Sequence, residues 1–153
     1  MGFIKRTSEL EYLNKFRDKK IIKVVTGVRR CGKSVLLNLY ADELKASGVV
    51  KERIISINLE DYNFHDLREP KALYNYVTHR LRPEVMNYVF LDEIQHVADY
   101  ADVVDALYIK DNVDLYVTGS NAYMLSSEIA TLLSGRYKKL CRINYTFWDK
   151  YGI

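Results

Sequence analysis

The run from Gly27 to Ser34, which reads G-x-x-x-x-G-K-S, constrains the fold of this chain more than any other feature. The residues before it, 21–26, are largely apolar and β-branched and predict a strand. The residues after it, 35–40, predict the start of a helix with one buried face. A glycine-rich turn in this context directs backbone N–H groups and the positive end of a helix dipole at an anion. The sequence therefore predicts a phosphate-binding loop.

Within that loop, two polar side chains have an expected task. Lys33 should reach the outer phosphates of a nucleotide, and the Ser34 hydroxyl should bind Mg²⁺. The alternative is a tight turn with a surface lysine, which would not explain the strand and the helix on either side. The residues that we expect to contact the nucleotide are Gly27, Arg30, Cys31, Gly32, Lys33, Ser34 and Val35.

The length and composition indicate one globular domain. The chain has 153 residues, of which 48% are apolar and 28% charged, and its net charge is +3. This mild excess of basic residues argues neither for nor against a nucleic-acid partner. Cys31 and Cys141 have no metal-ligand spacing and form no disulfide framework, so both are expected to be reduced thiols in a cytoplasm. No segment of the sequence reaches the roughly 18 apolar residues of a membrane helix, and we expect no membrane partner.

Strands and helices are expected to alternate along the chain. Ser8 and Glu11 form a capping box for the first helix, and Leu10, Leu13 and Phe16 make its apolar stripe. The last expected strand alternates polar and apolar residues, as an edge strand does. Such an alternation of elements predicts an α/β fold, a parallel sheet with helices on both faces. The expected helices span residues 7–18, 35–47, 70–82, 99–110 and 122–134, and the expected strands span residues 21–26, 54–59, 86–91, 113–118 and 137–145.

A pair of acids follows the third expected strand. The apolar residues 88–91 would carry Asp92 and Glu93 to the end of the strand that faces the ligand crevice of a parallel sheet. Asp92 is placed to bind Mg²⁺, directly or through water, opposite Ser34. Glu93 can orient and polarise an attacking water, which makes hydrolysis the natural reaction. The alternative is a pair of acids at the N-terminus of a helix.

Ser120 and Asn121 follow the fourth expected strand. If this strand lies beside the first, its end points at the terminal phosphate of the nucleotide. A neutral amide or hydroxyl there could hydrogen-bond the γ-phosphate or the attacking water, and Asn121 is the residue that we expect to do so. Either residue would also serve as the cap of the following helix.

Four stretches of the sequence together resemble one protein family. They are TGVRRCGKSVLL at 26–37, FLDEIQ at 90–95, TGSNAYML at 118–125 and SGRY at 134–137. These stretches are similar to the prokaryotic ATPase family of the AAA+ superfamily whose members often carry a C-terminal DUF4143 domain. The resemblance implies a three-layer αβα P-loop core of the ASCE type, with a five-stranded parallel sheet in the order 5-1-4-3-2, and Mg-ATP as the ligand. It also implies the roles given above for Lys33, Ser34, Asp92 and Glu93.

Two further expectations come from the resemblance. In AAA+ proteins an arginine near the position of Arg136 reaches the nucleotide of the neighbouring subunit, so Arg136 would act catalytically across the interface of a homo-oligomer. In the family, sequence similar to residues 144–149 leads into a helical lid and a C-terminal domain. The chain is therefore expected to comprise an ATPase core, residues 1–145, and a short segment, residues 146–153, that leads toward a lid absent from this sequence.

Other classes of nucleotide-binding protein remain alternatives. A GTPase would carry an N-K-x-D motif after the fourth strand, but the only near match, residues 14–17, precedes the loop and has Arg17 in place of the aspartate. A P-loop kinase for a small acceptor is a better rival, although the pair of Asp92 and Glu93 favours water as the acceptor. The non-enzyme alternative is an ATP-binding scaffold or switch with little turnover. The sequence does not identify the protein or nucleic-acid client of such an ATPase or switch.

Overall fold

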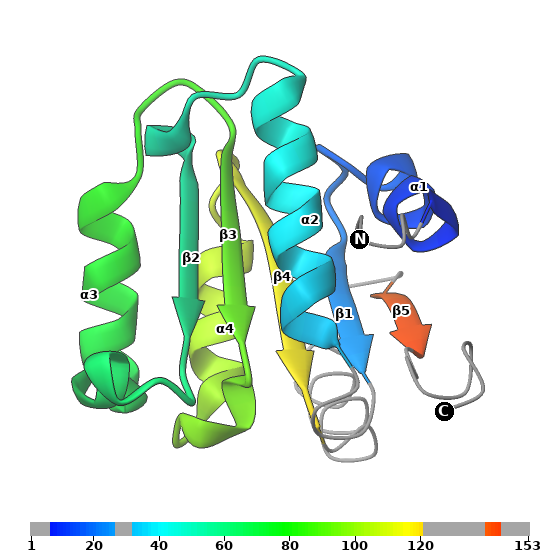
Figure 1. Ribbon diagram of the computed structural model, residues 1–153. Coiled ribbons are helices and arrows are strands. Elements are labelled where there is room, and N and C mark those ends of the chain that lie inside the picture. Colours follow the sequence, from blue (N-terminus) through cyan, green and yellow to red (C-terminus); the bar gives the residue numbers. More distant parts are fainter. Residues whose placement is uncertain (1–6, 27–31, 121–139, 145–153) are drawn as a thin grey trace.

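The computed structural model describes residues 7–26, 32–120 and 140–144, and its centre is a parallel β-sheet (Figure 1). Its order is 5-1-4-3-2 in strand numbers, and every neighbouring pair is parallel. The predicted five-stranded sheet and its order are therefore confirmed, and the last strand lies at an edge, as its alternating residues predicted. The strands are β1 (Ile22–Thr26), β2 (Ile54–Asn58), β3 (Asn87–Asp92), β4 (Val113–Gly119) and β5 (Leu140–Asn144).

Helices cover both faces of this sheet (Figure 1). In the described part of the chain, the α-helices are α1 (Thr7–Lys15), α2 (Lys33–Ala46), α3 (Pro70–Arg80) and α4 (Tyr100–Tyr108). The 3₁₀ turns η1 (Lys51–Arg53), η2 (Tyr62–Arg68) and η3 (Ile94–His96) lie in the connections. α1 and α2 share one apolar cluster with the sheet, and α3 and α4 share another on the opposite face. The three-layer αβα class predicted from the sequence is therefore confirmed.

The two apolar clusters are separate because alternate residues of a strand point to opposite faces of the sheet. In β3, Val89 and Leu91 belong to the cluster under α3 and α4, whereas Tyr88 and Phe90 belong to the cluster under α2. All four side chains are buried. A strand buried on both faces needs no polar face, which explains the continuous apolar run that marked β3 in the sequence.

An aromatic group lies between α2 and the sheet. Phe90 and Tyr116 stack with their ring centroids 4.7 Å apart, and Tyr40 of α2 packs against both rings. All three side chains are fully buried. Aromatic pairs of this kind each add about 0.5–1.5 kcal/mol beyond the area that they bury. These tyrosines are therefore part of the core and do not form an exposed platform on which bases could stack.

Local signals set the ends of the helices. Glu69 accepts the first free backbone N–H groups of α3, and Pro70 occupies the first turn, where its missing N–H has no consequence. Just after the C-terminal end of α2, Gly48 has a φ of +108°, the left-handed conformation in which glycine commonly ends a helix. Both ends agree with the predictions to within a residue or two.

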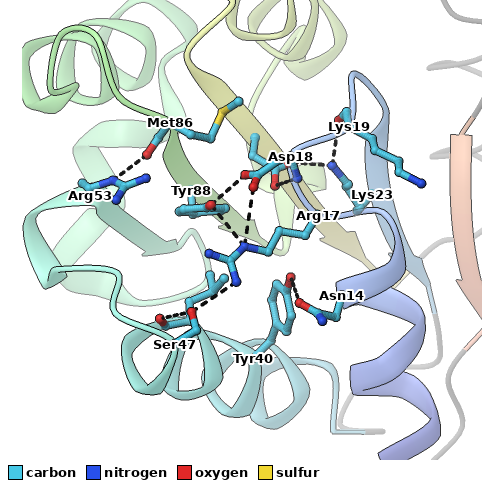
Figure 2. A network of polar contacts seen from close by, with 12 residues as sticks. Asn14, Arg17, Asp18, Lys19, Lys23, Tyr40, Ser47, Arg53, Met86 and Tyr88 are labelled. Carbon is cyan, nitrogen blue, oxygen red and sulfur yellow. Dashed lines mark hydrogen bonds and ion pairs between the residues drawn. The ribbon is translucent and has the colours of Figure 1, made fainter.

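α1 ends three residues earlier than predicted because the chain turns there toward the sheet. Asp18 has a φ of +62°, which does not continue a right-handed helix. Its carboxylate accepts a hydrogen bond from the Tyr88 hydroxyl at 2.6 Å, and its backbone N–H donates to Asp114 at 3.0 Å. Arg17 donates to the same Tyr88 hydroxyl and to Ser47, just beyond the end of α2 (Figure 2). These bonds tie the turn after α1 to β3, β4 and α2.

A buried ion pair lies beside this turn. Lys23 of β1 and Asp114 of β4 contact one another, and both side chains are fully buried. Lys23 also donates to the carbonyl oxygen of Lys19 at 3.0 Å (Figure 2), and Asp114 also accepts from the Tyr116 hydroxyl at 2.9 Å. Two opposite charges can be buried here because each has hydrogen-bond partners besides the other. Each is the second residue of its strand, so the pair lies where the parallel strands begin.

No helix within the described ranges is both long and apolar enough to cross a membrane.

Several predicted features lie outside the described residues. The features outside those ranges are the helix expected at 122–134, the segment 146–153, and the site residues Gly27, Arg30, Cys31, Asn121 and Arg136.

Candidate active site

The candidate site forms where β3 and β4 end beside the start of α2. Because the strands are parallel, their carboxyl ends meet at one edge of the sheet, where ligands bind in open α/β folds. Asp92 is the last residue of β3 and is buried. Its two carboxylate oxygens accept hydrogen bonds from the hydroxyl groups of Ser34 on α2 and Thr118 on β4. One carboxylate therefore joins three segments that are far apart in the sequence.

The start of α2 is shaped by Gly32, which has a φ of +99° and a ψ of 18°. Glycine adopts this left-handed conformation readily, whereas most other residues do so at a cost. Lys33 follows as the first residue of the helix, and only 3% of it is exposed. Its Nζ lies 3.6 Å from Oε1 of Glu93. A lysine buried to this extent needs an anionic partner, and Glu93 is one.

Glu93 itself has an unusual backbone, with a φ of 58° and a ψ of 53°. A residue with a side chain rarely adopts this conformation, and such strain is concentrated at functional sites. Its N–H donates to Oγ1 of Thr118 at 2.9 Å. Its carboxylate accepts hydrogen bonds from the Ser120 hydroxyl, at 2.8 and 3.1 Å for the two oxygens, and from Nε2 of Gln95. With Lys33 nearby, the strained turn holds this carboxylate among three donors.

The two neighbouring acids have pKa values that shift in opposite directions. For Asp92, burial is the largest influence and raises the pKa, although the two hydroxyl hydrogen bonds oppose it. For Glu93, burial also acts to raise the pKa, but the hydrogen bonds from Gln95 and Ser120 and the charge of Lys33 outweigh it, so the pKa is lowered. Glu93 is therefore ionised at neutral pH, whereas the Asp92 carboxylate stands to gain most from a nearby cation.

The oxygen atoms around Asp92 suit a magnesium ion. A carboxylate and a hydroxyl group side by side supply hard oxygen donors, and Mg²⁺ usually keeps several water ligands besides one or two carboxylates. Across the described ranges, no group of three or more histidine, cysteine or acidic side chains could hold a metal ion. A magnesium ion at this place would be held by Ser34 and Asp92, with water and substrate oxygens as its other ligands.

The structure brings together the central residues that the sequence placed in the site. Lys33, Ser34, Asp92 and Glu93 are connected by the contacts described above. The sequence placed Ser120 at this edge on the condition that β4 lies beside β1, and the structure meets that condition. The hydroxyl group of Ser120 contacts Glu93. Val35, expected to contact the nucleotide, is 42% exposed on the surface of α2.

Two residues of the site were not predicted. Thr118 has only a weak signal in the sequence, which depends on the strand register. Leu91 pairs with Val117, so the next residues of the two strands, Asp92 and Thr118, lie side by side. Gln95 has no signal of its own, because its contact depends on the left-handed turn at Glu93. A known strand register would have identified the threonine, and only the backbone conformation identifies the glutamine.

Comparison with known families gives one match that covers most of the chain. The profile of the AAA domain family AAA_14 matches residues 19–147, a range that contains all the site residues described above.

Two uncharacterized proteins are similar to this chain in sequence. One, from Haemophilus influenzae, is 39% identical over 140 residues, which cover 91% of this chain and 35% of the relative. The other, MJ1544 from Methanocaldococcus jannaschii, is 32% identical over 123 residues, which cover 77% of this chain and 25% of the relative. The chain thus spans about a third of the length of the first relative and about a quarter of the second.

Several solved structures are similar to this chain in fold. PCH-2 of C. elegans has a TM-score of 0.55 at 16% identity, covering 90% of this chain and 41% of that chain. Drosophila ORC bound to DNA has a TM-score of 0.57 at 11% identity, covering 96% and 95%. Rif2 in complex with the C-terminal domain of Rap1 has a TM-score of 0.58 at 15% identity, covering 90% and 51%. At these identities the similarity concerns the fold, and it agrees with the three-layer P-loop class.

Proposed function

Because this chain belongs to the AAA domain family, we propose that it binds ATP together with Mg²⁺ and hydrolyses it. The observation that carries the proposal is the cluster of contacts among Lys33, Ser34, Asp92 and Glu93 at the carboxyl edge of the sheet. A lysine, a hydroxyl group, a metal-binding acid and a second acid beside it are the parts from which P-loop proteins build phosphoryl-transfer sites.

Lys33 supplies the positive charge for the phosphates. Its 3.6 Å distance from Glu93 is that of a loose ion pair and not of a short hydrogen bond. The phosphates of ATP carry more negative charge than one carboxylate, so they would attract the ammonium group away from Glu93. Ser34 and Asp92 would hold Mg²⁺, which neutralises charge on the phosphate oxygens.

Glu93 acts on water. Its lowered pKa keeps the carboxylate ionised at neutral pH, so it can accept a hydrogen bond from a water and orient it. That water attacks the γ-phosphorus, the bond between this phosphorus and the oxygen shared with the β-phosphate breaks, and ADP leaves with that oxygen. The proton lost by the water passes to Glu93 or to a phosphate oxygen, and the products are ADP and inorganic phosphate.

Residues outside the described ranges complete the proposal. Asn121 directly follows Ser120, whose hydroxyl group contacts Glu93. We propose that the side chain of Asn121 hydrogen-bonds the γ-phosphate or the attacking water. We propose that Gly27, Arg30 and Cys31 form the part of the loop that encloses the phosphates, and that Arg136 reaches the nucleotide of a neighbouring subunit.

Isothermal titration calorimetry with Mg-ATP tests the binding step. Lys33→Ala removes a charge-assisted contact, so we expect the binding free energy to weaken by about 1.5–3 kcal/mol. Lys45→Ala, at the exposed end of the same helix, is the matched control and should bind ATP like the parent. Equal affinities for Lys33→Ala and the parent would refute the phosphate assignment.

Phosphate release without any added acceptor tests the chemical step. Glu93→Gln keeps the shape of the side chain, so ATP should still bind while turnover falls by at least ~10²-fold. Equal turnover in mutant and parent would show that Glu93 is not the base. Turnover that requires a small acceptor would indicate a kinase, and binding without turnover in the parent would indicate a scaffold or switch.

We infer that the ATPase acts on a macromolecular client and as a homo-oligomer. Two proteins with the same fold support the first part, since Drosophila ORC was solved bound to DNA and Rif2 in complex with a Rap1 domain. The net charge of +3 does not separate a nucleic-acid client from a protein client. An electrophoretic mobility shift with duplex DNA in the presence of Mg-ATP distinguishes them, and sedimentation velocity under the same conditions measures the oligomeric state.

A further inference from the structure

The side-chain amide of Gln95 donates a hydrogen bond to Glu93, whereas the oxygen of the same amide accepts none among the described residues. Gln95 lies in η3, two residues after Glu93, and its Nε2 donates to Oε2 of that carboxylate. The other end of the same amide, Oε1, is buried and has no hydrogen-bond partner among the described residues. Native proteins rarely leave a buried polar atom unpaired, and each such atom requires an explanation.

The reverse orientation of the amide would not resolve this. It would bring Oε1 against Oε2 of Glu93, so that two acceptors face each other, and it would take the donor away from the carboxylate. The carboxylate therefore sets the orientation of the amide. An apolar side chain of similar size would avoid the unpaired oxygen altogether, so packing does not explain why a glutamine occupies this position.

The donors around Glu93 would not remain the same with ATP bound. Lys33 is then needed at the phosphates, and its 3.6 Å contact with the carboxylate would lengthen. Ser120, on one side, contacts both carboxylate oxygens, and Gln95 contacts only Oε2. Two donors fixed on different segments hold a carboxylate in one orientation, whereas a single hydroxyl group would let it rotate.

We propose that Gln95 is a positioning residue for ATP hydrolysis, whose amide holds the Glu93 carboxylate in the orientation that receives the attacking water. This inference rests on the proposed function and gives Gln95 a role that neither the family match nor the sequence motifs assign. Gln95 acts only through Glu93 and forms no bond to the nucleotide.

The hydrogen bond can be observed directly because Gln95 is the only glutamine in the sequence. In protein labelled with ¹⁵N at the glutamine side-chain amide, NMR should show one pair of Nε2–H resonances, with the bonded proton shifted downfield. Glu93→Ala should return that proton to the position found in an unstructured peptide. An unshifted resonance in the parent would overturn the proposal.

Gln95→Leu separates positioning from folding. We expect kcat for ATP hydrolysis to fall roughly 10- to 100-fold, the effect of losing one hydrogen bond to a charged group, while KM and the affinity for Mg-ATP stay unchanged. The urea midpoint should change little, because the hydrogen bond that the Glu93 carboxylate loses is offset by removal of the unpaired oxygen. Asn112→Leu is the matched control, since this amide donates to the Arg82 carbonyl oxygen at 3.2 Å near the start of β4, and it should leave kcat unchanged.

The possible outcomes are distinct. Unchanged kcat in Gln95→Leu would overturn the positioning role and leave the proposed function intact. A fall in kcat with parallel losses of stability and ATP affinity would indicate a structural residue and would also overturn it. If the parent chain hydrolyses no ATP, the proposed function fails and the positioning role fails with it, while the NMR measurement still reports whether the bond exists.

Discussion

Replacing Thr118 with valine isolates the contribution of one hydroxyl group in the site. The side chain lies near the end of β4 and is fully buried. Its Oγ1 donates to Oδ1 of Asp92 and accepts the N–H of Glu93 at 2.9 Å. Valine has nearly the same shape and is also favoured in strands, so the substitution keeps the packing and removes the two hydrogen bonds.

The expected magnitude follows from the two groups that lose their partner. A buried donor or acceptor left unpaired costs about 1–3 kcal/mol, so the two together should lower the free energy of unfolding by about 2–6 kcal/mol. With an m-value of about 2 kcal/mol/M, the urea midpoint should fall by about 1–3 M. The pKa of Asp92 should rise further, because a hydrogen bond that stabilises its carboxylate is lost. Binding of Mg-ATP should therefore weaken most at low pH.

Thr118→Ser is the matched control for urea unfolding followed by circular dichroism. Serine keeps the hydroxyl group and loses one methyl group, which costs about 1 kcal/mol. We therefore expect the parent to be the most stable, the serine variant next and the valine variant the least. If valine is as stable as the parent and serine is less stable, packing and not the hydroxyl group determines the energetics, and the reasoning is refuted.

The buried pair of Lys23 and Asp114 should respond unequally to substitution. Asp114→Asn leaves the buried Lys23 cation uncompensated and should lower the free energy of unfolding by about 3–5 kcal/mol. Lys23→Met leaves Asp114 with its other donors and should lower the free energy of unfolding by less. Equal losses of stability for the two variants in urea unfolding would contradict this. Burial raises the pKa of Tyr40 to about 12. Between about pH 10 and 12 the unfolded chain therefore releases a proton that the folded chain keeps, so the free energy of unfolding falls as the pH rises. Tyr40→Phe should make this decline less steep in urea unfolding above pH ~10, since Tyr88 and Tyr116 also have raised pKa values, and an unchanged slope would disprove the assignment. Mixing Arg136→Ala chains with Lys33→Ala chains should restore ATPase activity that each lacks alone, whereas full activity of Arg136→Ala by itself would exclude a role across the interface.

The layers of the fold could be predicted from local patterns, but the neighbours of each strand could not. The apolar run of residues 88–91 indicates a buried strand wherever it lies in a sheet. Nothing in that run states that β3 lies between β2 and β4, or that Val24 pairs with Val117. The order came from the resemblance to a family, and the structure confirms it. The end of α1 was missed because the left-handed turn at Asp18 is stabilised by partners far away in the sequence.

The site could be predicted where its chemistry requires particular residue types at particular ends of elements. The positions of Lys33 and Asp92 belong to that group, because the glycine-rich motif before α2 and the apolar run that ends in an acid have strong sequence signals. The contacts that orient Glu93 do not have such signals. They depend on the strand register beside Thr118 and on a backbone conformation that the sequence around Gln95 does not specify.

The helix α2 is fixed at both of its ends. Ser34 in its first turn donates to Asp92, and Ser47 just beyond its last turn accepts a hydrogen bond from Arg17 at 3.1 Å. The 14 residues of the helix, at a rise of 1.5 Å each, place these two anchors about 20 Å apart. A helix of this length is stiff along its axis, so a displacement of its first turn reaches its last. α2 therefore connects the candidate site to the turn after α1, because any displacement of Ser34 along the helix axis would also move the anchor of Arg17.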